Sequence, residues 1–378
     1  MTEDERSNVR VEVLNDDDEN FRKRAADSLL IRAGWKPSEV TPGAEEFAGY
    51  SLKELARECL RQKGIKVPVN NLTEPVSRAL SSTDFPFLLT ETARQSLVKG
   101  FQEEKETYSQ WTGEMSVPDF KSRIIDVDVD IDNDNEMYDF NKFEEYRSIK
   151  MGKPVEAKIS PYCWEFQISR QSIINDELFF LTTKPSMEGA KVKNKIADVV
   201  YDIFKPSAPL MDDGKSLFHP DHNNISALGA NGNPTVDKIS AARHLLIFQT
   251  NQTGRRLNIQ PRVYLFPDNL YAAAETFFKS DKLGSPSGSN APNIYFNSLF
   301  RVYEPRLDDI SPNTFYLVGP KDMGVMVVYL AGNKTPFLES RKDFKTDGLD
   351  LKVRFDFGVK AVSWRAMVKA TTALEEII

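Results

Sequence analysis

Residues 349–369 have the sequence LDLKVRFDFGVKAVSWRAMVK, in which apolar and polar side chains alternate. The apolar residues occupy odd positions up to Val359 and even positions from Val362 to Val368. Alternation with a period of two is the pattern of a β-strand with one buried face. Because the apolar positions change parity just after Gly358, the sequence predicts a bulge or kink within one long strand.

Helices are expected upstream of this strand from apolar spacing and from capping residues. Ser51 and Glu54 have the spacing of a capping box, and Gly64 lies where a left-handed C-terminal cap is expected. A second helix is expected to begin at Asp84, because apolar residues then recur every four positions. Further helices are expected at residues 187–204 and 236–249 and after Asp268, which would cap the last one.

Two stretches near the N-terminus carry little helical pattern. Residues 1–25 are polar and acidic, and we expect them to form a tail. Residues 67–82 have the composition of a linker, which predicts a boundary near Ser81 and Ser82. Strands are expected at residues 126–132, 146–149, 165–168 and 260–266.

The net charge of −7, from 49 basic and 56 acidic side chains, is concentrated in one segment. Residues 119–145 contain ten carboxylates and three bases, so the remaining residues sum to zero. A neutral remainder argues against a broad basic face for nucleic acid. With 40% hydrophobic residues and 24 phenylalanines, the chain can bury a sizeable core, which excludes general disorder.

Within the acidic segment, aspartates alternate with valine or isoleucine over residues 126–132, which predicts a strand with one acidic face. An EF-hand calcium loop starting at Asp130 would need glycine at Asn135 and glutamate at Asn141, and neither is present. A divalent ion that bridges the carboxylates of this strand stays open as an alternative to a solvated acidic face.

The cysteines and the apolar runs predict a soluble, cytoplasmic product. Cys59 and Cys163 lie far apart in sequence, which fits a reducing compartment. The longest apolar stretch, residues 325–331, is far shorter than the roughly 20 residues that a membrane helix needs. The first 20 residues are polar and lack the apolar core of a signal peptide.

The three histidines, His219, His222 and His244, limit the chemistry that the chain can perform. His219, Asp221 and His222 form an HPDH cluster of metal-binding side-chain types, but Pro220 interrupts any helix there and no second ligand motif is near. Backbone hydrogen bonding is the alternative role for these rings. Phosphate-binding glycine motifs and nucleophile elbows are absent, so the sequence supports no catalytic or cofactor-binding residue.

Four strings of the sequence resemble the major capsid proteins of tailed bacteriophages, specifically the Mu-like major head subunit group and the capsid part of protease–capsid fusions. In order, they are SSTDFPFLL (81–89), ISRQSIINDEL (168–178), DGKSLFHPDHNN (213–224) and DFGVKAVSW (356–364). Residues 30–80 resemble the region before the capsid part in the fused relatives. The family has Gly-Asn where this chain has Asn223 and Asn224.

This resemblance implies the α+β, Hong Kong 97-type phage capsid fold, divided into six consecutive segments. These are a leader of acidic tail and helix (1–82), an N-terminal arm and helix (83–118), an extended loop (119–185), a spine helix and following loop (186–235), a mostly axial domain (236–320), and peripheral-domain strands with the C-terminus (321–378). In the fused relatives the upstream portion is a protease that uses Ser and His. Because no histidine precedes His219, the leader is expected to be scaffold-like, and a protease acting in trans is expected to cut near residues 81–84.

The implied function is that of a virion structural protein with no enzymatic activity and no cofactor or metal. It would self-assemble through hexamers and pentamers, in the bacterial host cytoplasm, into an icosahedral shell around double-stranded DNA bound without sequence specificity. Portal, maturation protease and decoration proteins are the further implied partners, and no membrane is involved. The alternatives are an encapsulin-like protein compartment of the same fold and a metal-dependent enzyme built on His219 and His222.

We also expect particular side chains to contact neighbouring subunits. An extended loop without its own core needs a packing surface from another copy. Buried aromatic residues and complementary charges are the groups that carry such contacts. The candidates are Tyr162, Trp164 and Phe166 as aromatic anchors on the loop, and Asp128, Asp130 and Asp132 facing Arg255 and Arg256 of a neighbour.

Overall fold

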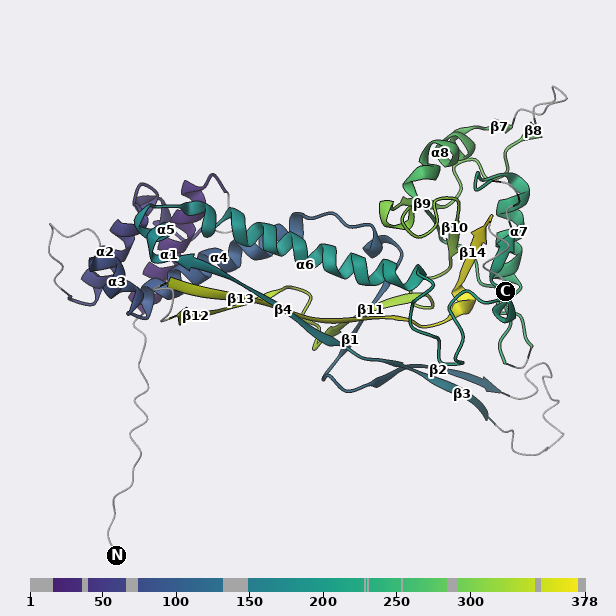
Figure 1. The fold of residues 1–378 in the computed structure, drawn as a ribbon, viewed down its shortest axis with the longest axis horizontal. Helices are drawn as coiled ribbons and strands as arrows, with labels where there is room; N and C mark the ends of the chain where they lie inside the picture. The colour runs from purple at the N-terminus through teal and green to yellow at the C-terminus, as the bar shows by residue number, and fades with distance from the viewer. Residues whose placement is uncertain are drawn as a thin grey trace, which may run out of the picture. The chain divides into compact units, whose positions relative to one another are not determined.

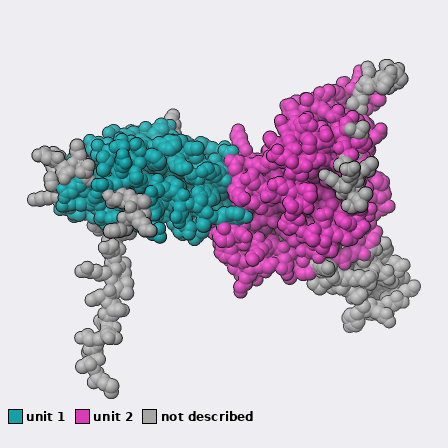
Figure 2. Space-filling model, viewed as in Figure 1, with its two compact units in different colours: residues 1–104, 162–192, 335–355 teal, residues 105–161, 193–334, 356–378 magenta. Residues whose placement is uncertain are grey.

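The computed structural model describes residues 16–35, 40–65, 74–131, 149–227, 229, 231–252, 254–283, 291–343 and 348–372. Two compact units share the chain (Figure 2): unit 1 has residues 1–104, 162–192 and 335–355, and unit 2 has residues 105–161, 193–334 and 356–378. Helices and sheets occur in both units (Figure 1), which confirms the predicted α+β class. Both units are discontinuous in sequence. The division into two units does not test the six consecutive segments implied by the resemblance, which remain a prediction.

Unit 1 contains a cluster of helices, and the structure confirms the helices predicted from Ser51 and from Asp84. The cluster consists of α1 (Asp16–Arg32), α2 (Leu52–Gln62), α3 (Glu74–Leu80), α4 (Asp84–Glu103) and α5 (Arg170–Ile174), followed by the start of α6 (Thr183–Tyr201). The Ser51 hydroxyl accepts from the Glu54 N–H at 3.3 Å, and the Glu54 carboxylate accepts from the Ser51 N–H at 2.7 Å, so the capping box is confirmed. Gly64 has the expected positive φ of 70°. Burial raises the pKa of Cys59 to about 12, which keeps this core thiol protonated.

Two predictions near the N-terminus are wrong. Residues 16–25 were expected in a tail but begin α1, whereas residues 1–15 lie outside the described residues. Residues 74–80 were expected in a linker but form α3, which buries Val76, Ala79 and Leu80. A seven-residue helix with a proline in its first turn is too short to show a periodic pattern. Packing against its neighbours, rather than intrinsic helix propensity, stabilises such an element.

Helices α4 and α6 touch through their backbones in unit 1. A Cβ added to Gly100 would lie 2.0 Å from the Ser186 carbonyl oxygen, and one added to Gly189 would lie 2.0 Å from the Leu97 carbonyl oxygen. Glycine destabilises a helix interior by roughly 0.5–1 kcal/mol relative to alanine. Here the two glycines offset that cost because they let the helices pack at backbone contact. The predicted helix over 187–204 is confirmed as α6 followed by the 3-10 turn Asp202–Phe204.

The first sheet has the strand order β1-β11-β13-β12, and β4 also pairs with β13. The strands are β1 (Gly113–Val117), β4 (Ser160–Ser169), β11 (Val325–Leu330), β12 (Phe337–Asp343) and β13 (Gly348–Ala361). In unit 1, β13 pairs with β12 from Gly348 to Arg354. In unit 2, β13 pairs with β11 from Phe357 to Ala361. A Cβ on Gly358 would lie 2.3 Å from the Lys158 carbonyl oxygen, so the backbone at Lys158 packs directly against β13 at this glycine.

The expected bulge within one long C-terminal strand is wrong. After Ala361 the chain leaves the first sheet, makes the 3-10 turn Trp364–Ala366 and enters the second sheet as β14 (Met367–Thr371). The change of parity therefore marks the passage between two sheets. Alternation reports which face of a strand is buried, and it carries no information about which strand is the partner.

The second sheet lies in unit 2 and has the order β5-β14-β10-β6-β9. Its other strands are β5 (Ile225–Ala227), β6 (Val263–Phe266), β9 (Phe300–Tyr303) and β10 (Phe315–Val318), and it packs with α7 (Val236–Ile247) and α8 (Tyr271–Lys279). Every residue of β6 and β10 is buried. This sheet and these two helices share one apolar core, which includes Ile239, Leu246, Phe266, Phe278, Phe315 and Val368.

Asp268 does not cap α8, contrary to the prediction. The helix is preceded by the 3-10 turn Asp268–Leu270, and the Asp308 carboxylate accepts from the N–H groups of Asp268 and Asn269 at 3.0 Å each. The acceptor for these N–H groups of the turn lies 40 positions from Asp268 in sequence, which no local pattern could reveal. The predicted helix at 236–249 and the predicted strand at 260–266 are confirmed as α7 and β6.

A two-stranded antiparallel hairpin completes unit 2 (Figure 1). It consists of β2 (Arg123–Ile131) and β3 (Ile149–Ala157), with register shifts between Ile124 and Asp126 and between Val127 and Val129. A two-residue ladder joins β7 (Lys282–Leu283) to β8 (Ala291–Pro292). The remaining 3-10 turns are Ala44–Phe47, Tyr108–Gln110, Leu178–Phe180, Pro220–His222 and Pro305–Leu307. In the described part of the chain, no helix has the apolar length that crossing a bilayer requires.

Candidate assembly surfaces

Two of the strings that carry the family resemblance meet in unit 2. The His222 ring stacks on the Trp364 ring at 4.4 Å with an interplanar angle of 11°. His222 is buried, with Nε2 2.8 Å from the Asp213 carboxylate and Nδ1 3.1 Å from the Leu217 carbonyl oxygen. Burial acts to raise the pKa of Asp213, but the hydrogen bonds from His222 and from the Lys215 N–H, together with their positive charges, outweigh it, so the pKa is lowered. This histidine holds a loop to the C-terminal turn.

The neighbouring asparagines explain the departure from the family pattern. Asn224 is fully buried, and its Nδ2 donates to the carbonyl oxygens of Leu217 at 2.8 Å and Trp364 at 3.4 Å. Asn223 has a φ of 50°, which lies in the left-handed region. Glycine and asparagine are the residues that adopt this region most readily, so Asn223 can replace the glycine of the family.

The side chains of the HPDH cluster make hydrogen bonds that stabilise a turn. The Nδ1 of His219 accepts from the Asp221 N–H at 3.2 Å, and the Asp221 carboxylate pairs with Lys215 at 2.5 Å. The rings of His219 and His222 are 5.7 Å apart. Both nitrogens of His222 already have partners, so a metal would have to displace them. Among the described residues, no group of three or more His, Cys, Asp or Glu side chains could hold a metal ion.

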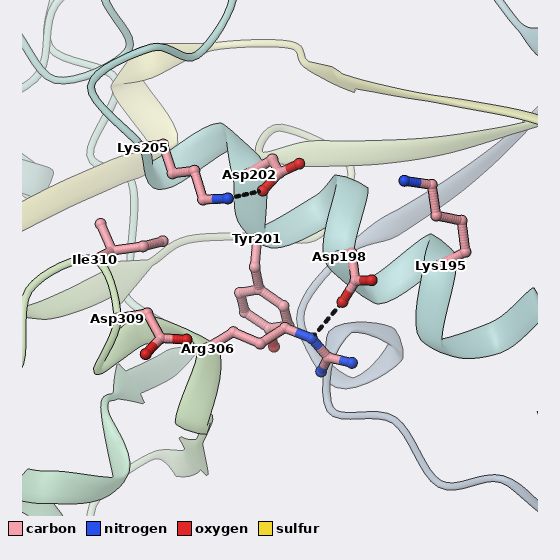
Figure 3. A pocket seen from close by; sticks show the side chains of 8 residues that line it. All are labelled: Lys195, Asp198, Tyr201, Asp202, Lys205, Arg306, Asp309 and Ile310. Atoms are coloured by element: carbon pink, nitrogen blue, oxygen red, sulfur yellow. Dashed lines mark hydrogen bonds and ion pairs between the residues drawn. The ribbon is translucent and has the colours of Figure 1, made fainter. Parts of the chain in front are cut away.

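A pocket of about 340 Å³ in unit 2 is lined by several charged side chains (Figure 3). Arg306 points toward α6, where its Nε is 2.8 Å from Asp198. Its Nη atoms contact Glu106 at 3.1 Å and the buried Glu304 at 3.0 Å. Burial acts to lower the pKa of Arg306, but hydrogen bonds with Glu106 and Asp198 raise it. The residues lining the pocket are Lys195, Asp198, Tyr201, Asp202, Lys205, Arg306, Asp309 and Ile310.

This network joins residues that are distant in sequence. The guanidinium of Arg306 is shared among carboxylates, so it is not available to bind an external anion. The pocket has no histidine or cysteine, and its tyrosine is engaged because the Tyr201 hydroxyl is 3.1 Å from the Trp111 Nε1. Burial raises the pKa of Tyr201, which keeps the phenol neutral. The network ties α6 to the turn at Pro305–Leu307.

The three aromatic residues expected to anchor contacts share one face of β4. Tyr162, Trp164 and Phe166 are half-buried, and the residues between them are exposed. The Trp164 Nε1 donates to the Glu188 carboxylate at 2.8 Å, and Lys184 pairs with that carboxylate at 2.7 Å. Trp164 is thus engaged within unit 1, and the role of these aromatic residues between subunits remains a prediction.

The structure describes the acidic and basic candidates only in part. The backbones of Asp128 and Asp130 lie on β2, but their side chains and the whole of Asp132 lie outside the described residues. Arg255 and Arg256 are exposed, and the Arg256 guanidinium carbon is 3.7 Å from the centroid of the Phe248 ring. Their pairing across subunits remains a prediction. The contact between Arg256 and Phe248 has no signal in the sequence, whereas a local charge count would reveal the five basic and no acidic residues of 238–267.

Several solved structures are similar in fold to this chain, whereas its sequence has no curated match. A virus-like particle from Pyrococcus furiosus is similar in structure, with 13% identity, a TM-score of 0.44, and coverage of 74% of this chain and 98% of that chain. The encapsulin SrpI complex of Synechococcus elongatus PCC 7942 has 9% identity, a TM-score of 0.44, and coverage of 72% and 89%. Mycobacterium phage Adephagia has 10% identity, a TM-score of 0.46, and coverage of 70% and 89%.

The sequence itself matches a family model described as phage capsid protein over residues 164–370, which is more than half of the chain. The match includes three of the four strings noted in the sequence, at 168–178, 213–224 and 356–364. The long helix α6, the β2–β3 hairpin and the two sheets fit the Hong Kong 97-type layout that the resemblance implied, and this fold class is confirmed. The chain belongs to the phage capsid protein family and is a structural protein of a capsid shell.

Proposed function

We propose that this chain is the major subunit of an icosahedral head, which assembles through hexamers and pentamers around double-stranded DNA. The observation that carries this proposal is the β2–β3 hairpin. Among its described side chains, Ala157 at the base joins an apolar cluster with Val117, Ile159 and Val328, whereas Ile124 is 60% exposed. A two-stranded sheet is marginally stable in water. Another subunit would supply the missing packing surface.

The proposal requires no catalytic step. The polar groups of the His222 turn and of the Arg306 pocket are used for hydrogen bonds and ion pairs within the chain. Heterologous contacts between identical subunits close into rings when the rotation between copies allows it. The free energy of assembly would come from many such contacts, each centred on a few well-packed side chains. We therefore propose a structural role without enzymatic activity.

Electron microscopy of the purified protein tests this proposal. We expect closed shells of uniform diameter, assembled from rings of six and five subunits. The nucleic acid content of particles from host cells then separates a head that packages double-stranded DNA from an encapsulin-like compartment, which would instead contain a protein cargo. A monodisperse monomer under all assembly conditions, including after removal of residues 1–82, would contradict the proposal.

The proposal extends to further partners during assembly in the bacterial cytoplasm. Portal and decoration proteins would bind the shell, and a maturation protease in trans would remove residues 1–82. In unit 1, Arg22 pairs with the buried Asp84, and Lys63 lies 3.0 Å from the same carboxylate. A cut between residues 81 and 84 would separate Asp84 from the segment that supplies both cations. Intact-mass measurement on mature particles tests this, because an uncut chain would contradict it.

A further inference from the structure

A basic surface lies at the C-terminal end of α7 and on the loop that follows this helix in unit 2. We define the α7 basic surface as Arg243, His244, Phe248 and Arg256, whose side chains are all exposed. They belong to residues 238–267, which carry five basic and no acidic side chains, so nothing within this segment neutralises the surface. The sequence therefore concentrates positive charge at one end of the helix.

The two arginines of this surface have no carboxylate partner among the residues that the structure describes. Other arginines of the chain, such as Arg32, Arg301 and Arg306, pair with carboxylates of the same chain. A guanidinium that the fold leaves without a counterion keeps its charge and its N–H donors for a partner from outside. Arg243 and Arg256 are therefore the cations of this surface that can bind an anion.

Stacking and backbone pairing hold Arg256 in place. Its guanidinium carbon lies 3.7 Å from the centroid of the Phe248 ring, and the centroid of the His244 ring lies 3.8 Å from the same point. The backbone of Arg256 forms an antiparallel bridge with Thr250. A stacked guanidinium keeps N–H groups at its edge, where a phosphate can accept two parallel hydrogen bonds. Because the side chain is already ordered, less conformational entropy is lost on binding.

We propose that the α7 basic surface binds the phosphate backbone of double-stranded DNA, and that in the shell this end of α7 faces the packaged duplex. A duplex carries one charge per roughly 1.7 Å of its axis, so it can contact several cations of one surface whatever its sequence. An acidic protein would have to place its carboxylates to match the same cations, and it is the alternative partner that the experiment must exclude. The inference rests on the proposed function, because only a shell that packages DNA places a duplex beside the subunit.

The salt dependence of DNA binding tests this contact. Fluorescence anisotropy of a short labelled duplex is measured with the full-length protein at several salt concentrations. Arg243→Gln/Arg256→Gln should weaken binding about tenfold at low salt and reduce the slope of log K against log salt by about 1.8, because each lost phosphate contact contributes about 0.9. Phe248→Leu keeps both charges but removes the stack, so it should weaken binding about threefold with an unchanged slope. Thermal melting confirms that each variant is folded.

The matched control is Arg61→Gln/Arg341→Gln, at two exposed arginines of unit 1 that pair with carboxylates, and it should bind the duplex as the wild type does. Unchanged duplex binding by Arg243→Gln/Arg256→Gln, or no duplex binding by the wild type, would overturn the inference. So would poly-glutamate that competes as well as the duplex, charge for charge, because the partner would then be an acidic protein.

Shell yield separates this contact from a contact between subunits. Arg243→Gln/Arg256→Gln should form shells at the wild-type yield, because the proposed partner is DNA. A lower yield from the folded variant would contradict the inference and would favour the pairing of Arg256 with a neighbouring subunit that the sequence predicts. Failure of the wild type to form particles would instead refute the proposed function, since duplex binding is measured without shells.

Discussion

The second sheet and the β2–β3 hairpin belong to the same unit but differ in what stabilises them. In the sheet, β6 and β10 are buried along their whole length between other strands and the helices α7 and α8. In the hairpin, Ala157 is packed at the base, whereas Ile124 and Arg123 are exposed. The difference fits two roles within one chain: the sheet stabilises the fold, and we propose that the hairpin contacts another copy.

This comparison changes the meaning of the net charge. The charge of −7 equals the excess of carboxylates in residues 119–145, a segment that includes β2. The sheet, by contrast, carries long apolar runs such as VYLF in β6 and FYLV in β10. Apolar burial drives folding, and exposed charge contributes mainly to the rate and specificity of association. Substitutions in the two regions should therefore affect different measurements.

The largest effect on stability is expected for Phe266→Ala. This fully buried ring lies in β6 and packs against Phe315 and Phe278 in the core. Its removal should lower the free energy of unfolding by about 3–5 kcal/mol, through lost burial and a residual cavity. Urea denaturation measures the change. Phe300→Ala, at a ring that is 55% exposed in the same sheet, is the control, and an equal loss there would contradict the comparison.

A smaller loss is expected for Asn224→Ala. The substitution removes the side-chain donor to the Trp364 carbonyl oxygen and one of the two side-chain partners of the Leu217 carbonyl oxygen in a buried site. Unsatisfied buried groups cost about 1–3 kcal/mol, so the unfolding midpoint in urea should fall accordingly. Asn223→Gly is the matched control at the next position, where the φ of 50° suits glycine, and its stability should remain close to that of the wild type. Similar losses for both variants would be inconsistent with this assignment.

The pH dependence of stability should show a smaller effect at Glu275, a residue of α8 that accepts from Tyr303 of the second sheet. Hydrogen bonds, the first from Lys279 and the next from Tyr303, lower the pKa of Glu275 from 4.5 to about 2. A lowered pKa stabilises the folded state above pH 4.5, and that contribution is lost as the pH falls from about 4.5 toward 2. Glu275→Gln should therefore reduce stability at neutral pH and flatten the stability profile in that window. An unchanged profile by denaturant titration would exclude this role.

The smallest effect on stability is expected in the hairpin. Asp128→Asn/Asp130→Asn should change the free energy of unfolding by less than about 0.5 kcal/mol, because our proposal assigns these carboxylates to assembly and gives them no part in the core. The same change should reduce the salt dependence of assembly, because it removes charges that salt screens. Light scattering at several salt concentrations measures this dependence. A large loss of stability with unchanged assembly would show that these carboxylates stabilise the fold, contrary to the role proposed for the hairpin.

Local signals predicted a good part of the fold. The capping box at Ser51, the helix start at Asp84 and the helix α7 depend on residues a few positions apart, and the structure confirms them. Local signals missed three features: the contact of Asp308 with the turn at Asp268, the change of sheet after Ala361, and the short helix α3. Each of these depends on a partner that is distant in sequence, which periodicity cannot identify.

The candidate sites show the same limit. The sequence placed His219 and His222 in a loop and allowed backbone hydrogen bonds as their role, but it could not show that Trp364 covers His222. The cation Arg306 and its carboxylates Glu106 and Asp198 are separated by about a hundred residues or more, so no motif joined them. Charge counting found the acidic hairpin, whereas the stacking of Arg256 on Phe248 required the three-dimensional structure.

The central claim is that the fold is complete without the hairpin but the shell is not. Residues 125–155 can be replaced by Asn-Gly, because Ile124 and Glu156 are paired and a two-residue turn can join them. Sedimentation velocity of this variant beside the full-length protein tests the claim most directly. The account predicts shell-sized particles for the full-length protein, and small species with an unchanged melting temperature for the variant. Shells of equal yield from the variant would contradict it.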